Sequence, residues 1–248
     1  MIRLVRLELL KLRTTPAAPV AFGLTAVLTV TAAVANIFLA GQKGMAPLGS
    51  TQNVGKVLAL GSVTSIAMLV LGIMIAAGED RHRTILGTYL GEPRRGRVLV
   101  AKLFTAGAVG AIGGALLFGL ALAVALPLYA AKGVHHLPVN LQSLWLGTTL
   151  ITACFGLVGV ALGALTRNTV AAIIGALVWV GIIELAFLQP VIPSLAKWLP
   201  TGAGVALTTV GSSHRHLLAP AAAALVLVGW AALISAAAAR TTLRRELR

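Results

Sequence analysis

Charged side chains are scarce in this chain. Only 10% of its 248 residues are Asp, Glu, Lys or Arg, and six of these are acidic, whereas 58% of all residues are hydrophobic. A soluble domain would carry roughly 25% charged residues to cover its surface in water. The shortage of charge excludes an ordinary soluble globule and predicts an all-α integral membrane protein.

Aromatic residues and cysteine are also rare. Aromatic side chains make up 5% of the chain and are not interleaved with its basic residues. The net charge of +14 therefore does not indicate a stacking platform for nucleic acid, and no nucleic-acid partner is expected. The single cysteine, Cys154, lies inside an apolar run, so no intrachain disulfide can form.

Catalytic motifs are missing as well. No G-x-x-x-x-G-K-[S/T] loop occurs, so the chain is not expected to hydrolyse ATP or to be an enzyme. The histidine pairs at 135–136 and 214/216 have no nearby Cys or carboxylate, so no metal is expected. No cofactor is expected on this chain either.

Long apolar runs dominate what is present. The first is preceded by basic residues like a signal peptide, but it is long enough to cross ~30 Å of hydrocarbon and is expected to be retained. Six transmembrane helices are predicted, at Ala17–Leu39, Val57–Ala77, Leu103–Tyr129, Leu144–Leu165, Val170–Leu188 and Leu217–Ala239. Residues 166–169 predict a tight hairpin between the fourth and fifth.

Basic residues alternate with these runs and predict the topology. Fifteen fall on one side and five, at positions 43, 56, 132, 197 and 215, on the other. Because positively charged loops stay in the cytoplasm, both termini are predicted to be cytoplasmic, with the chain in a bacterial plasma membrane. The fifteen are Arg3, Arg6, Lys11, Arg13, Arg81, Arg83, Arg94, Arg95, Arg97, Lys102, Arg167, Arg240, Arg244, Arg245 and Arg248.

Glycines four apart predict close helix packing. Gly110 and Gly114 lie in the third run, and Gly159 and Gly163 in the fourth. Small residues let helix backbones approach each other in lipid. Packing inside one subunit is the preferred interpretation, and a dimer interface is the alternative.

Two segments predicted to be cytoplasmic carry distinctive patterns. Residues 1–16 mix leucine with basic residues and predict a helix lying on the inner leaflet, with one apolar stripe at Ile2, Val5, Leu9 and Leu12. Residues 79–98 predict a short helix, capped by Glu79 or Asp80 and ended by Gly91 and Pro93. An ordinary cytoplasmic extension of the first run is the alternative for the first segment, and a solvated loop is the alternative for the second.

These segments carry a resemblance to a known family. An acidic residue ending the second run, then Thr84-Ile85, Pro93-Arg94-Arg95-Gly96-Arg97 and Ala101-Lys102, is similar to permease subunits of type-2 ABC exporters. Leu7–Arg13 resembles their N-terminal elbow helix, and Trp198–Gly204 their outer segment of short re-entrant helices, here 189–216. The resemblance covers essentially the whole chain as one permease domain, residues 1–248.

The resemblance implies partners and roles. Glu79 would position a coupling helix, and Thr84, Ile85 and Leu86 would contact a separate ABC ATPase subunit that binds ATP and Mg²⁺. A second permease chain, identical or a paralogue, would complete the pathway among membrane lipids. The cargo would be hydrophobic or amphipathic: a drug, metabolite, lipid-like molecule or antimicrobial peptide.

Glu184 is the single carboxylate inside a predicted span. A charge in the bilayer costs ~2.5–3.5 kcal/mol on insertion scales, so Glu184 is a candidate for an intramembrane function. The preferred interpretation is structural, with the carboxylate reaching interfacial water or capping backbone amides of the next segment.

Two other functions stay open from the sequence. An integral membrane enzyme acting on lipids would need clustered polar groups, and the spans offer Glu184 alone. A non-transporting membrane module that recruits a partner would share every feature above.

Overall fold

The computed structural model describes residues 1–42, 45–59, 61–81, 95–210 and 217–244. Every regular element in these ranges is a helix. The elements are α1 (Ile2–Thr14), α2 (Ala17–Phe38), α3 (Thr51–Leu58), α4 (Gly61–Arg81), α6 (Arg95–Ala131), α7 (Leu141–Thr166), α8 (Thr169–Leu177), η1 (Val178–Leu188), α9 (Gln189–Val191), α10 (Pro193–Ala196), α11 (Pro200–Thr208) and α12 (Pro220–Arg244).

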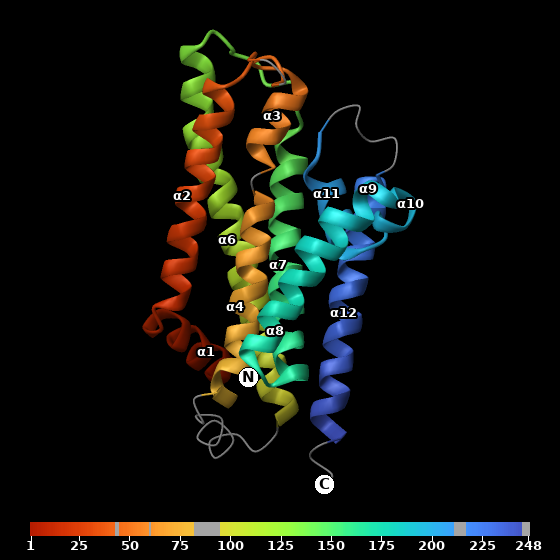
Figure 1. Cartoon of the computed structure of the whole chain (residues 1–248). Coiled ribbons are helices and arrows are strands. Elements are labelled where there is room, and N and C mark those ends of the chain that lie inside the picture. The colour runs from red at the N-terminus through yellow and green to blue at the C-terminus, as the bar shows by residue number, and fades with distance from the viewer. Residues whose placement is uncertain (43–44, 60, 82–94, 211–216, 245–248) are drawn as a thin grey trace.

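The long helices run side by side as an up-and-down bundle (Figure 1). Helix α1, the start of α6, the turn between α7 and α8, and the end of α12 lie at one end. The connections from α2 to α3 and from α6 to α7 lie at the other end. Helix α1 and the end of α12 thus lie at the same end of the bundle.

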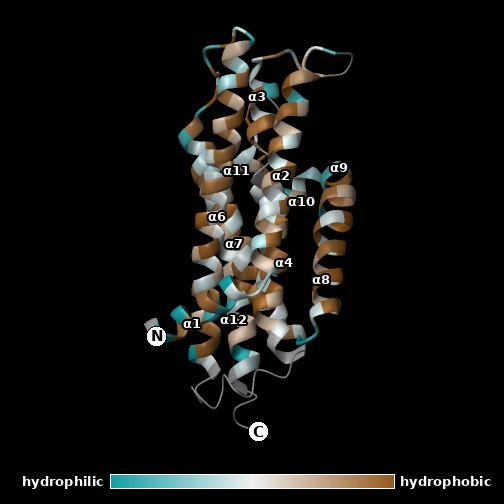
Figure 2. Ribbon diagram, turned by 90° about the vertical axis from the view of Figure 1, so that its left-hand side faces the viewer, coloured by the Kyte–Doolittle hydropathy of each residue, from teal (hydrophilic) through white to brown (hydrophobic). Residues whose placement is uncertain are grey.

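Five helices of the described chain are long and apolar enough to cross a membrane: Ala17–Phe38, Gly96–Ala131, Leu141–Thr166, Thr169–Val191 and Pro220–Thr242. Figure 2 shows hydrophobic residues along these helices and hydrophilic residues around α1 at one end. Their exposed side chains include Leu24, Ile112 and Leu225, as expected of a surface that faces lipid. The transmembrane character predicted from composition is confirmed.

Helix α7 is the centre of the bundle. In its most apolar stretch 61% of the residues are buried, against 22% in the corresponding stretches of α2, α12 and the helix from Thr169 to Val191. It packs closely on α4, where a Cβ on Gly159 would lie 2.2 Å from the Leu69 carbonyl oxygen. A Cβ on Gly110 of α6 would lie 2.6 Å from the Thr152 oxygen. The predicted internal packing of both glycine pairs is confirmed, since Gly114 and Gly163 also meet α7 and α4 atoms of the same chain.

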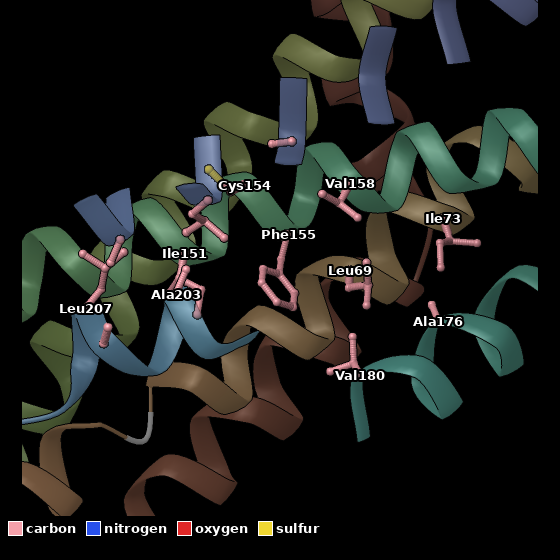
Figure 3. Packing of buried hydrophobic residues seen from close by; sticks show 14 of the residues in the cluster. Leu69, Ile73, Ile151, Cys154, Phe155, Val158, Ala176, Val180, Ala203 and Leu207 are labelled. Atoms are coloured by element: carbon pink, nitrogen blue, oxygen red, sulfur yellow. The ribbon is translucent and has the colours of Figure 1, made fainter. Parts of the chain in front are cut away.

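The largest cluster of buried apolar side chains joins α7 to α4, α8, η1, α11 and α12 (Figure 3). The Phe155 ring of α7 lies between Leu69 of α4 and Ala203 of α11. Ala176 and Val180 reach the same cluster from α8 and η1. Lipid offers little hydrophobic drive for helix association, so dispersion contacts at these close approaches are what hold the bundle together.

The structure corrects the prediction for the second apolar run. A continuous helix over Val57–Ala77 was predicted, but α3 ends at Leu58 and α4 begins at Gly61. Ser50 starts α3 by accepting a hydrogen bond from the Asn53 backbone N–H. Within α4, the apolar stretch Thr64–Gly78 is shorter than a usual membrane span. The apolar pattern continues through the break, so hydropathy could not reveal it.

The prediction for residues 79–98 is also corrected in part. Helix α4 continues to Arg81, so Glu79 and Asp80 lie in its last residues rather than capping a new helix. Helix α6 already begins at Arg95, eight residues before the predicted start of the third run at Leu103. Thr84, Ile85 and Leu86, the predicted coupling contacts, lie outside the described residues.

The remaining boundaries follow the predictions closely. Arg167 ends α7 in the left-handed conformation, and Asn168 caps α8 by accepting from the Val170 and Ala171 amides, which forms the predicted hairpin. The outer segment contains the short helices α9, α10 and α11. The fifth run was predicted as an ordinary helix, but η1 is a π-helix.

Candidate functional site

A buried ion pair joins α1 to the helix bundle. Glu8 of α1 and Lys102 of α6 are each 5% exposed, and the Lys102 Nζ lies 3.1 Å from Glu8 Oε2. The same ammonium donates to the Ile75 carbonyl of α4 at 3.0 Å. Lys11 adds a second, half-exposed cation 3.0 Å from Glu8 Oε1. One carboxylate and one ammonium therefore hold α1, α4 and α6 together; we call this set the inner anchor.

The inner anchor lies beside the predicted coupling segment. Helix α4 leads into residues 82–94, and α6 leads out of them. Lys102 is two turns into α6, and Ile75 lies two turns before the end of α4. A displacement of either helix end must therefore move, or break, the contact with Glu8.

The sequence did not identify Glu8 as a buried residue. Leu9 of the predicted apolar stripe is 44% exposed, so it is not part of the contact with the bundle. The inner face of α1 instead presents Glu8 beside the partly buried Val5 and Leu12. The polar contact to Lys102, 94 residues away, sets which face turns inward.

Glu184 forms a second buried polar site, farther along the bundle. Its side chain is 1% exposed and lies on η1. Oε2 accepts hydrogen bonds from the Thr201 backbone N–H, at 3.0 Å, and from the Thr201 hydroxyl. Oε1 accepts from the Trp179 indole N–H.

These bonds place a carboxylate at the N-terminus of α11. Thr201 is the second residue of that helix, and the N-cap residue Leu199 has no side-chain oxygen to accept from it. A carboxylate there satisfies an orphan N–H and complements the helix dipole. The sequence analysis preferred a structural role for Glu184, in which its carboxylate caps backbone amides of the next segment. The hydrogen bond from the Thr201 amide is such a cap.

The π-helical geometry of η1 explains how Trp179 reaches Glu184. In a π-helix the backbone hydrogen bonds join residues five apart, so residues i and i+5 lie near each other on one face. Trp179 and Glu184 have this spacing. In addition, Trp230 of α12 donates its indole N–H to the Trp198 carbonyl at 2.9 Å. The outer segment is thus tied to both η1 and α12.

A third polar cluster lies at the opposite end from α1. Asn53 of α3, 3% exposed, accepts from the Tyr129 hydroxyl at 2.7 Å and donates to the Asn36 carbonyl at 3.2 Å. Lys132 donates to the Ile37 carbonyl at 3.2 Å and lies over the Phe38 ring. These contacts fasten α3 to the ends of α2 and α6, and the sequence reasoning did not single out Asn53 or Tyr129.

Of the predicted functional residues, the structure describes the side chain of Glu184 and the backbone of Glu79. It does not bring these two together, because Glu184 lies on η1 and Glu79 in the last turn of α4. Within the described ranges, no group of three or more His, Cys, Asp or Glu side chains is placed to hold a metal ion.

No protein-family model matches the chain, and no curated protein matches it significantly.

Proposed function

We propose that this chain is the membrane-spanning permease subunit of an ATP-driven ABC exporter. A separate ATPase subunit would supply the energy, and a second permease chain would complete the pathway for a hydrophobic or amphipathic cargo. α4 would serve as the sixth span, beside the five longer apolar helices, and both termini would be cytoplasmic.

The inner anchor is the observation that carries this proposal. An exporter of this kind must convert motion of a cytoplasmic ATPase into motion of its spans. Here Glu8 and Lys102 join an amphipathic helix to the two helices that flank residues 82–94. A partner that moves residues 82–94 would act on α4 and α6 together, and through Lys102 on α1.

The resemblance supplies the rest of the proposed mechanism. Closure of the ATPase dimer on ATP and Mg²⁺ would push on Thr84, Ile85 and Leu86, and α4 and α6 would tilt in response. Cargo would then leave between two permease chains. The apolar, weakly charged spans suit a hydrophobic or amphipathic cargo.

The test replaces Ile85 and Leu86 together with Asp, in a chain co-expressed with the proposed ATPase subunit. Charge in the contact should release the ATPase on detergent extraction and abolish ATP-dependent transport into inverted vesicles, because truncating one central interface residue can already cost ~2 kcal/mol. Leu39→Asp with Met45→Asp, two exposed residues at the opposite end, is the matched control and should retain the ATPase. Assembly and transport that survive the first double substitution would refute the proposed coupling.

The proposed topology has its own test. In a Cys154→Ala background, Arg95→Cys should react with an impermeant thiol reagent only after intact cells are permeabilised. Met45→Cys, at the other end of the bundle, should react from outside without permeabilisation. The reverse pattern would place both termini outside the cell.

A further inference from the structure

The outward face of α1 combines arginine with leucine. Three arginines and three leucines line a shallow hollow of about 450 Å³ on this helix. The leucine side chains are 44–55% exposed, and the arginines are exposed as well. The six residues are Arg3, Arg6, Leu7, Leu9, Leu10 and Arg13; we call this set the arginine–leucine face.

The inner anchor fixes the direction of this face. Glu8, buried against Lys102, lies on the opposite side of α1. Rotation of α1 about its axis would pull Glu8 away from a buried ammonium, which is strongly unfavourable. The arginine–leucine face therefore stays outward as a preorganised surface.

The charge on this face is not neutralised within the described chain. Glu8, the acidic residue of α1, already faces two ammonium groups, Lys102 and Lys11. No described carboxylate lies within ion-pair distance of Arg3, Arg6 or Arg13. Guanidinium groups bind oxyanions such as phosphate and carboxylate in bidentate geometry, so this face matches phosphate or carboxylate groups spread along α1.

The position of α1 next to a membrane-crossing helix favours lipid phosphate among these anions. Thr14 ends α1 and Ala17 begins the membrane-crossing helix α2, so two residues separate the helices. Three Cα–Cα steps from Thr14 to Ala17 reach at most ~11 Å, which keeps the end of α1 near the boundary between head groups and acyl chains. There the leucines can contact acyl chains while the arginines contact phosphates, whereas a fully aqueous partner would leave the leucines without apolar contact.

We propose that the arginine–leucine face of α1 binds phosphate groups of anionic phospholipids. The lipid chains would cover Leu7, Leu9 and Leu10, and each guanidinium group would bind a phosphate group that lies beside it along the helix. This site requires no ATPase and no transport activity, so it stands or fails independently of the proposed function.

The test compares lipid binding by two triple variants of the full chain. Arg3→Gln with Arg6→Gln and Arg13→Gln should weaken phosphatidylglycerol binding, measured by native mass spectrometry, by roughly fivefold per arginine and about a hundredfold in total. Arg97→Gln with Arg167→Gln and Arg240→Gln is the matched control. It removes the same charge from the same end of the bundle, outside α1, and should retain the wild-type affinity.

A thermal measurement gives a second readout. Phosphatidylglycerol should raise the unfolding midpoint of the wild-type chain more than phosphatidylcholine does, and the α1 variant should lose this difference. If the α1 triple variant does not fold, the single variant Arg6→Gln, at an exposed position, should still show a roughly fivefold loss in affinity.

Several results would overturn the proposal. Equal binding of phosphatidylglycerol by the two triple variants would place the lipid elsewhere. A stabilisation reproduced by inorganic phosphate alone would indicate a site for free phosphate. A variant that keeps its lipid but loses a protein partner would show that the arginine–leucine face docks protein instead.

Discussion

Replacing Lys102 with Met should release α1 from the bundle. The ammonium lies 3.1 Å from Glu8 Oε2 and 3.0 Å from the Ile75 carbonyl, and both charged residues are 5% exposed. Removing one partner of a buried ion pair costs ~3–5 kcal/mol, because the other charge stays desolvated. Lys11 still faces Glu8 in this variant, so we expect the lower end, about 3 kcal/mol.

The pairwise interaction is isolated by a double-mutant cycle with Glu8→Leu. Each single variant should cost about 3 kcal/mol, whereas the double variant leaves neither buried charge of the pair. Its cost should fall at least ~2 kcal/mol below the sum, since apolar replacements of a buried pair are often nearly neutral. Lys11→Met is the control: its ammonium is half-exposed, so its loss should cost ~0.5 kcal/mol.

Amide hydrogen exchange of the peptide covering residues 2–14 is the appropriate assay, because it measures local opening of α1. A cost of about 3 kcal/mol should speed exchange by more than a hundredfold, and the control should change it about twofold. If the two single costs add within ~0.5 kcal/mol, Glu8 and Lys102 are not coupled and the inner anchor does not hold α1.

Three further predictions concern the core, Glu184 and ATP. Gly159→Ala should destabilise the bundle by ~1–3 kcal/mol, because its Cβ would lie 2.2 Å from the Leu69 oxygen; Gly175→Ala, which meets no atom within 4 Å, should be neutral or stabilising in detergent unfolding. Glu184→Gln should cost ~1–3 kcal/mol in the same assay, since an amide N–H₂ would then face the Trp179 or Thr201 donors, and an unchanged midpoint would contradict the capping role. The purified chain alone should show no ATPase activity, and turnover that copurifies with it would contradict the proposed division of labour.

Much of the helix layout could be predicted from the sequence. The first run was predicted at Ala17–Leu39 and is found at Ala17–Phe38, and the hairpin at Arg167 was located correctly. Apolar length is a local property, and the bilayer selects helices by that property alone. The break between Leu58 and Gly61 and the π-helix η1 escaped prediction, because hydropathy does not change where hydrogen-bond geometry does.

The candidate sites, in contrast, could be predicted from the sequence only in small part. Glu8 looked like a surface charge on a basic segment, and nothing near it in the chain indicates that it is buried against Lys102. Glu184 stood out as a carboxylate within an apolar run, but its partner Thr201, 17 residues away, could not be named.

The sequence by itself therefore determined that the chain has the apolar helices of a membrane protein and roughly where those helices run. The tertiary structure decided which of its few charges are buried and which helices they join. The physical reason is that solvation by lipid acts on each segment separately. A buried carboxylate, in contrast, is tolerated only where distant segments bring donors to it, as Lys102 does for Glu8 and Thr201 for Glu184.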